Sequence, residues 1–204
     1  SANRIIAVSQ CTKRDIVRCY GIDENKIDVV YQGCDDGFKI KRSSEELMSV
    51  RKRYGLPDGR FILYVGTVEE RKNVLLAVKA LSAIDRDVPL VIVGRETGYA
   101  DIVKNYVAKH RLGDRVLFRQ IHFADLPATY QLASVFVYPS RYEGFGIPVL
   151  EALCCGVPVV SATGSCLEEA GGEGSVYVDP DNVEEMADAL NNILGDASLR
   201  RTMI

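Results

Sequence analysis

Residues 135–151 read Val-Phe-Val-Tyr-Pro-Ser-Arg-Tyr-Glu-Gly-Phe-Gly-Ile-Pro-Val-Leu-Glu. The apolar start predicts a buried strand that ends at Tyr138. A loop with two glycines follows. A helix is expected from about Ile147, with Pro148 in its first turn, where a missing N–H costs no hydrogen bond. A strand, a glycine-containing loop and a helix in direct succession are typical of a parallel α/β sheet.

The same alternation extends over most of the chain. Near-continuous apolar runs are typical of strands that are covered on both faces. These runs are residues 61–65, 89–93, 116–118, 135–138, 157–160 and 176–178. Apolar residues at three- and four-residue intervals predict helices at residues 73–84, 99–110, 126–132, 147–155 and 183–194. The pattern predicts an open, doubly wound parallel sheet rather than a barrel, with ligands at the carboxyl ends of the strands.

The first 34 residues are organised differently from the rest. They predict a strand, a helix and a second strand, at residues 4–8, 12–20 and 27–31. A polar stretch after Gly33 is typical of a hinge or linker. We therefore expect three parts. They are the tail of a preceding domain (1–34), a linker with a lead-in helix (35–59), and a ligand-binding domain truncated near its C-terminus (60–204).

Two helix starts carry the spacing of a capping box. In this motif a side chain before the helix and a Glu three residues later bond each other's backbone N–H groups. Ser43 with Glu46 and Asp181 with Glu184 have this spacing. We therefore expect helices to begin directly after Ser43 and Asp181.

Composition and charge narrow the possible partners. The chain has 25 Lys and Arg against 28 Asp and Glu, a formal net charge of −3 at pH 7, and its basic residues are scattered. This pattern disfavours nucleic acid and anionic membranes. No apolar run approaches the roughly 20 residues of a membrane helix, and the first residues lack a signal-peptide layout, so we expect a cytoplasmic location. The six cysteines form no CxxC pair and are expected to be small buried thiols.

The glycine loop and the helix after it predict a cradle for a phosphate or a sugar. Gly144 and Gly146 let a ligand approach the backbone, and the helix start adds unpaired N–H groups. Glu143 and Glu151 can address one ligand, because helical side chains lean toward the N-terminus, and carboxylates accept pairs of hydroxyl hydrogen bonds. Taken singly, Glu143 could instead complement the helix dipole, and Glu151 could be a solvated helix residue.

A second motif follows the strand at residues 61–65. Gly66-Thr67 forms a turn, and Arg71-Lys72 are expected to open the next helix, where positive charge opposes the helix dipole. An unfavourable placement invites a functional cause, and the pair could neutralise a diphosphate without a metal. The alternative is a solvated charge cluster with the neighbouring glutamates.

Other patterns are weaker. Asp179-Pro180-Asp181 and Asp85-Arg86-Asp87 have the Asp-x-Asp form used for metals elsewhere, but they read as turns, and we expect no metal. Gly-x-Gly-x-x-Gly and the Walker lysine are both missing, which disfavours a dehydrogenase or a P-loop enzyme. A glycosidase that uses Glu143 and Glu151 would have no use for the Arg-Lys pair.

These motifs resemble the retaining glycosyltransferases of group 1, or family 4, over nearly all 204 residues. That family's signature is two carboxylates separated by seven residues, as in Glu143 and Glu151. Ile6-Ala-Val-Ser9 and Val30-Tyr-Gln-Gly33 also look like the last elements of the family's N-terminal domain. The resemblance implies the C-terminal, donor-binding half of the GT-B architecture, which is Rossmann-like without Gly-x-Gly-x-x-Gly.

The resemblance also implies roles for residues. Glu151 would hold the ribose, Glu143 a sugar hydroxyl, and Arg71 with Lys72 the diphosphate. The backbone amides of Phe145 and Gly146 would hold the sugar or the β-phosphate, and the base would lie near Arg95 and Ile121. The full expected set is Gly66, Arg71, Lys72, Arg95, Ile121, Glu143, Gly144, Phe145, Gly146 and Glu151, with Arg71, Lys72 and Glu143 acting in catalysis.

The implied donor is a UDP- or GDP-sugar, with no cofactor. The Arg71-Lys72-Asn73 form leans toward mannosyl transfer from GDP-linked donors. The family's acceptor site lies largely in the missing N-terminal domain, so this chain alone should bind but not turn over. A sugar-nucleotide epimerase shares the architecture and stays open as the alternative.

Overall fold

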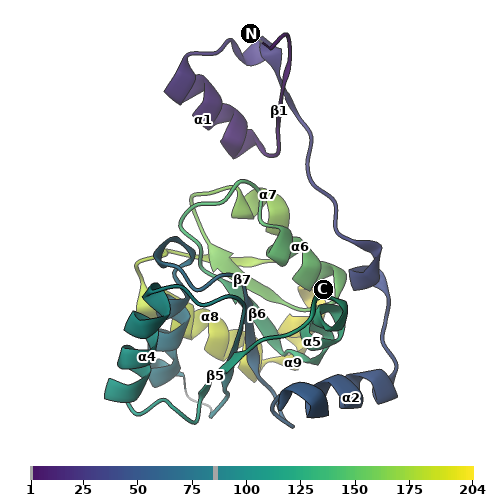
Figure 1. The fold of residues 1–204 in the computed structure, drawn as a ribbon, viewed down its shortest axis with the longest axis vertical. Coiled ribbons are helices and arrows are strands. Elements are labelled where there is room, and N and C mark those ends of the chain that lie inside the picture. The colour runs from purple at the N-terminus through teal and green to yellow at the C-terminus, as the bar shows by residue number, and fades with distance from the viewer. Residues whose placement is uncertain (1, 85–86) are drawn as a thin grey trace.

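The computed structural model describes residues 2–84 and 87–204 (Figure 1). Within those residues the main sheet has six strands, in the order β5-β4-β3-β6-β7-β8, and each neighbouring pair is parallel. The strands are β3 (Ile62–Val65), β4 (Leu90–Val93), β5 (Val116–Arg119), β6 (Val135–Tyr138), β7 (Val159–Ala162) and β8 (Val176–Val178). The doubly wound α/β fold predicted from the sequence is therefore confirmed.

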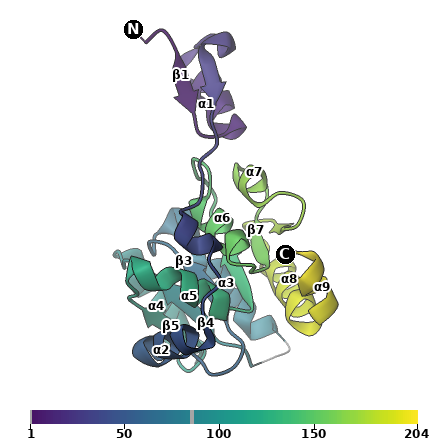
Figure 2. The same ribbon diagram turned by 90° about the vertical axis from the view of Figure 1, so that its right-hand side faces the viewer.

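Helices cover both faces of this sheet (Figures 1 and 2). On one face α3 contacts α4 and α8, and α9 packs on α8. On the other face α2 contacts α5, α5 contacts α6, and α6 contacts α7. The helices are α2 (Ser44–Tyr54), α3 (Val74–Ala80), α4 (Tyr99–Lys109), α5 (Leu126–Leu132), α6 (Ile147–Cys154), α7 (Leu167–Gly171), α8 (Val183–Gly195) and α9 (Ala197–Thr202).

Strand β3 lies between β4 and β6. Ile62 is in register with both Leu90 of β4 and Val135 of β6. The chain runs outward from β3 through β4 to β5 and then returns to the other side of β3 as β6. The strand order thus reverses between β3 and β6, which is where open α/β sheets form their ligand crevices. The loops that follow β3 and β6 therefore lie where a ligand crevice is expected.

Burial explains why these strands are continuously apolar. Each residue of β6 has 0% of its surface exposed, and Ile62, Leu63 and Tyr64 of β3 are at most 1% exposed. The rings of Tyr64 and Tyr138 stack with their centroids 6.0 Å apart. Both strands thus end in a tyrosine or next to one, with the ring in the core and the hydroxyl able to seek a partner.

The first part of the chain forms its own small unit. Strands β1 (Ile5–Ala7) and β2 (Ile27–Val29) pair in parallel beside helix α1 (Gln10–Tyr20). Figures 1 and 2 show this unit beyond α7, with an extended segment leading from it toward α2. The two strands do not join the six-stranded sheet among the described residues.

One of the two predicted helix caps is correct. Ser43 and Glu46 form both bonds of the capping box at the start of α2. The prediction for Asp181 was wrong by one residue, because Asn182 caps α8 and accepts from the N–H groups of Glu184 and Glu185. The Asp181 carboxylate pairs with Arg141 instead.

Two element boundaries also differ from prediction. The helix expected at residues 73–84 is α3 followed by a 3-10 turn, Leu81–Ala83. Strand β7 begins at Val159, because Val157 donates its N–H to Ala152 and so completes the end of α6. The short helix α7 was not anticipated.

Three further expectations concern what the chain lacks or buries. Of the six cysteines, Cys166 is buried and Cys19 is exposed, while the other four are intermediate, so the expectation of six buried thiols was wrong. Residues 85 and 86, in one of the two Asp-x-Asp patterns, lie outside the described residues. No helix in the part that the structure describes has the length and apolar character needed to cross a membrane.

The loops after β3 and β4 touch backbone to backbone. A Cβ built on Gly94 would lie 2.2 Å from the carbonyl oxygen of Gly66, and Gly94 has φ +145°. The N–H of Gly66 donates to the carbonyl of Val93, and the N–H of Val68 donates to the carbonyl of Arg95. The two loops therefore stay paired past the ends of their strands. Only glycine fits at position 94.

We expect Gly94→Ala to lower the free energy of unfolding by about 3 kcal/mol, because the new Cβ would overlap a carbonyl at a backbone angle that L residues avoid. Gly98→Ala is the matched control, since Gly98 has φ −56° and no atom within 4 Å of an added Cβ. Urea unfolding of both variants measures the difference. Equal stability of the two variants would contradict the close approach.

Candidate functional site

The two predicted motifs lie on the two sides of the strand-order reversal. The loop after β3 leads through a 3-10 turn, Glu70–Lys72, into α3, and the loop after β6 leads into α6. The backbone N–H of Arg141 donates to the carbonyl of Arg71 at 2.9 Å, so the loops are bonded to each other. We call Arg71, Lys72, Glu143 and residues 144–146 the strand-end site.

Arg71 and Lys72 do not open helix α3, contrary to the sequence prediction. They occupy the 3-10 turn, and Asn73 follows in the left-handed conformation, with φ +55°, before α3 begins. Both cations therefore precede α3 and lie outside its first turn. Asn73 is 7% exposed, and its amide donates to the carbonyl of Pro180 at 2.8 Å.

The structure brings both cations to Glu143. The Glu143 carboxylate lies 3.1 Å from the Arg71 guanidinium and 3.7 Å from the Lys72 amine. Arg71 also pairs with Glu69 at 2.6 Å and donates to the carbonyl of Tyr142. Glu143 and Lys72 are 14% and 15% exposed, whereas Arg71 is 42% exposed, so the shared carboxylate is much less solvated than a surface ion pair.

Two residues that sequence reasoning missed hold Glu143. Tyr138 donates its hydroxyl to the Glu143 carboxylate at 3.0 Å, and Ser140 donates to the same oxygen at 2.9 Å. Lys72 in turn donates to the Tyr138 hydroxyl at 2.8 Å. Burial and the Glu143 charge raise the pKa of Tyr138, so its hydroxyl remains protonated and able to donate. The sequence marks Tyr138 only as the end of a strand, since the residues before it are all core residues.

The glycine loop ends in an open helix start. Gly146 precedes α6 with φ +115°, and a Cβ there would lie 2.7 Å from Leu167. In the described residues, the N–H groups of Phe145, Gly146 and Ile147 donate to no protein acceptor. Unpaired N–H groups at a helix N-terminus favour anions and other oxygen acceptors. The phosphate or sugar cradle expected at this helix start stays a prediction.

Glu151 lies on α6 and is buried. It is 8% exposed and accepts a hydrogen bond of 2.9 Å from Tyr130, which has no exposed surface. Burial raises the pKa of Glu151, the Tyr130 bond opposes that rise, and Asp35 adds to it. The alternative of a solvated helix residue is therefore excluded, and Tyr130 is a further partner that the sequence did not indicate.

The residues expected near the base are less closely tied to the others. Arg95 is exposed after β4, and Ile121 is half-buried after β5. Gln120 joins the two strand ends by donating its amide to the carbonyl of Gly94 at 2.7 Å. Among the described residues, neither Arg95 nor Ile121 forms a hydrogen bond or ion pair with Arg71, Lys72 or Glu143.

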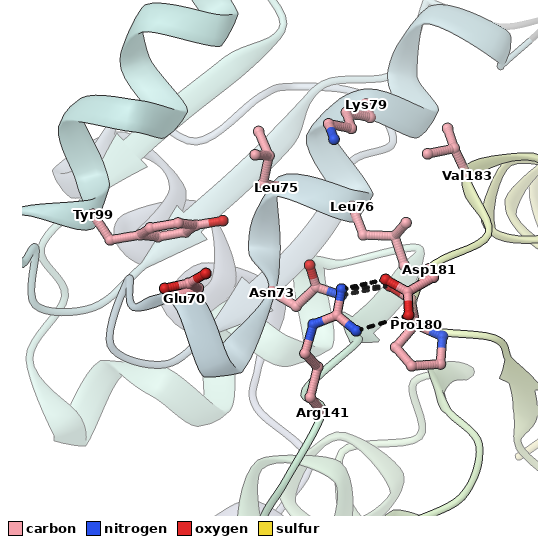
Figure 3. Close-up of a pocket in the computed structure, with 10 residues that line it drawn as sticks. All are labelled: Glu70, Asn73, Leu75, Leu76, Lys79, Tyr99, Arg141, Pro180, Asp181 and Val183. Atoms are coloured by element: carbon pink, nitrogen blue, oxygen red, sulfur yellow. Dashed lines mark hydrogen bonds and ion pairs between the residues drawn. The ribbon is translucent and has the colours of Figure 1, made fainter.

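A cavity of about 180 Å³ lies beside the turn that carries Arg71 and Lys72 (Figure 3). Arg141 and Asp181 form a two-bond ion pair on its wall, at 2.6 and 3.1 Å. Because the backbone of Arg141 also bonds to Arg71, this pair connects the turn to the loop before α8.

Comparisons with known proteins agree with this architecture. A family model described as glycosyl transferases group 1 matches residues 49–204. The O-antigen chain mannosyltransferase B of Escherichia coli is 33% identical over 98% of this chain and 54% of its own length. The O-antigen chain mannosyltransferase RfbU of Salmonella typhimurium is 30% identical over 93% of this chain and 50% of its own length.

Solved structures share the fold. Anabaena HepE in complex with UDP and glucose superposes with a TM-score of 0.90 and 22% identity, over 99% of this chain and 56% of that chain. At this identity the match supports the fold alone. The chain spans about half the length of the curated relatives it matches.

We expect Tyr130→Phe to lower the free energy of unfolding by about 1–3 kcal/mol at pH 7, because a buried carboxylate loses its hydrogen-bond donor. The change raises the folded-state pKa of Glu151 further above its ordinary 4.5. The loss should therefore shrink as the pH falls below that raised pKa, where the carboxyl is protonated. Urea unfolding at pH 7 and pH 4 tests this, with Tyr20→Phe as an exposed control. A loss that does not change with pH would contradict the assigned role of the bond.

Proposed function

The chain belongs to the glycosyl transferases group 1 family, and from this membership we propose that it is the nucleotide-sugar-binding part of a retaining glycosyltransferase. The observation that carries the proposal is the convergence of two cations and a carboxylate beside an open helix start. Arg71 and Lys72 come from the loop after β3, and Glu143 comes from the loop after β6. A nucleoside diphosphate sugar offers the matching groups, namely two phosphates and a set of hydroxyls.

The chemical contribution of the site is stabilisation of the leaving group. When the bond between the sugar and the β-phosphate breaks, negative charge grows on the diphosphate. Arg71 and Lys72 both pair with Glu143, which brings two positive charges to the place where negative charge develops in the transition state. Their charge makes a metal unnecessary in this proposal, and we propose that no cofactor takes part.

The neighbouring groups would orient the donor. Glu143 accepts hydrogen bonds and is held in place by Tyr138 and Ser140, so it suits a sugar hydroxyl. The free N–H groups of Phe145 and Gly146 suit the sugar or the β-phosphate. We assign the ribose to Glu151 on α6. Gly66 has φ +157°, and a Cβ there would lie 3.2 Å from the Tyr64 hydroxyl, so glycine suits this position beside Lys72.

The base would meet the ends of β4 and β5, near Arg95 and Ile121. The two O-antigen relatives are mannosyltransferases, which supports the lean toward a GDP-linked mannose donor and toward polysaccharide or glycoconjugate synthesis. Both relatives are transferases, so transfer is preferred to epimerisation.

The length of the relatives suggests a division of labour. They are about twice as long as this chain, which covers 54% and 50% of them. We propose that residues 1–34 complete an N-terminal domain that holds the acceptor and that residues 60–204 hold the donor, with residues 35–59 as the linker. The chain alone would then bind the donor without transferring it, and we propose a cytoplasmic location for the whole enzyme.

Calorimetry with UDP and GDP tests the proposal directly. We expect one of them to bind the 204-residue chain, and Lys72→Ala to weaken that binding by about 1–3 kcal/mol, the scale of a charge-assisted hydrogen bond. Lys52→Ala on the exposed face of α2 is the control for a general loss of positive charge. Failure of a folded wild-type chain to bind either nucleotide would oppose the proposal.

The affinity should also depend on pH through Glu151. Hydroxyl donors on the ligand favour the charged carboxylate, so binding lowers a pKa that burial has raised above 4.5. Affinity for the nucleotide should therefore increase as the pH rises through that raised pKa. Glu151→Gln should remove this pH dependence and weaken binding above it. Parallel pH profiles for wild type and Glu151→Gln would rule out the ribose assignment.

A further inference from the structure

Two hydroxyls at the start of helix α1 donate hydrogen bonds to the glycine loop of the strand-end site. Ser9 donates to the carbonyl of Gly144 at 2.7 Å, and Thr12 donates to the same carbonyl at 3.1 Å. Ser9 is fully buried, and its oxygen also accepts from the N–H of Thr12, so it caps α1 at the same time. A single backbone carbonyl thus has two side-chain donors, both from the first part of the chain.

Other contacts fix α1 in this position. The Glu169 carboxylate on α7 accepts from the N–H groups of Gln10 and Cys11, at 2.7 and 2.8 Å. Tyr142 donates its hydroxyl to Asp15 at 2.9 Å. These bonds hold α1 from two segments of the main domain. The position of Ser9 and Thr12 beside Gly144 therefore does not depend on a single contact.

The two hydrogen bonds to the Gly144 carbonyl set the direction of the N–H group of Phe145. A trans peptide is planar, so the C=O of Gly144 and the N–H of Phe145 point in opposite directions. Because the carbonyl points at α1, the N–H of Phe145 points away from it. This N–H has no protein acceptor among the described residues. Phe145 is 6% exposed, and the centroid of its ring lies 5.6 Å from that of Tyr31.

We propose that Ser9 and Thr12 are positioning residues for the donor, because they fix the Gly144–Phe145 peptide so that its N–H meets an oxygen of the β-phosphate or of the sugar. The inference rests on the proposed function of the strand-end site. It adds that the first part of the chain, which supplies no residue to the expected donor contacts, determines how well one of those contacts is aimed. The effect should concern groups beyond the α-phosphate and leave nucleoside recognition unchanged.

The test compares Thr12→Val with Thr12→Ser in the 204-residue chain. Valine keeps the shape of threonine but removes its hydroxyl, whereas serine keeps the donor. Calorimetry gives the affinities for the monophosphate, the diphosphate and the diphosphate sugar of the base that wild type binds. We expect Thr12→Val to weaken the diphosphate or the diphosphate sugar by about 3- to 10-fold, the effect of one lost hydrogen bond. Thr12→Val should bind the monophosphate within about 2-fold of wild type. Thr12→Ser should bind the diphosphate and the diphosphate sugar as wild type does.

A second variant guards against the case that one donor suffices. Ser9→Ala removes the shorter bond and the cap of α1, so urea unfolding must first show that the variant is folded. The affinity of Ser9→Ala for the diphosphate or the diphosphate sugar, divided by its affinity for the monophosphate, should fall at least as far as in Thr12→Val. If both of these ratios are unchanged in both variants, or if all three ligands lose affinity equally, the inference is overturned while the proposed function stays intact. Wild type that binds none of the nucleotides overturns both.

Discussion

Strands β3 and β6 are neighbours in the sheet, and this adjacency forces the loops at their carboxyl ends into one space. Gly94 meets the carbonyl of Gly66 on one side, and Arg141 donates to the carbonyl of Arg71 on the other. Backbone contacts between the loops therefore place the cations and Glu143 near one another, and the contacts between their side chains add to this.

Two buried tyrosines each donate a hydrogen bond to one of the two carboxylates of the signature. Tyr138 places its ring in the core and its hydroxyl on Glu143, while Tyr130 places its ring in the core and its hydroxyl on Glu151. A tyrosine suits this role because its apolar body favours burial while its polar tip satisfies a carboxylate that has little access to water. The two carboxylates of the signature are thus each attached to the core and not only to their own loop or helix.

Periodicity was enough to predict the sheet, because buried parallel strands leave a continuous apolar pattern that solvent-facing strands lack. The glycine loop, Arg71, Lys72 and Glu143 could be placed at one edge for the same reason. The parts that could not be predicted depend on single backbone angles or on contacts between distant residues. Asn73 in the left-handed conformation moved Arg71 and Lys72 out of α3. No spacing in the sequence indicates that the hydroxyl of Tyr138 would reach Glu143.

On the proposed function, binding a diphosphate is an exchange of charge partners. Arg71 and Lys72 face Glu69 and Glu143, so these four side chains sum to no net charge. The phosphates gain full attraction only if a carboxylate gives way. Glu143 accepts from two hydroxyls in addition to its cations, whereas the Arg71 side chain is 42% exposed and its other carboxylate partner, Glu69, is 34% exposed. The exchange therefore falls on Arg71, which can leave Glu69 for the ligand while Glu143 keeps its place for a sugar hydroxyl.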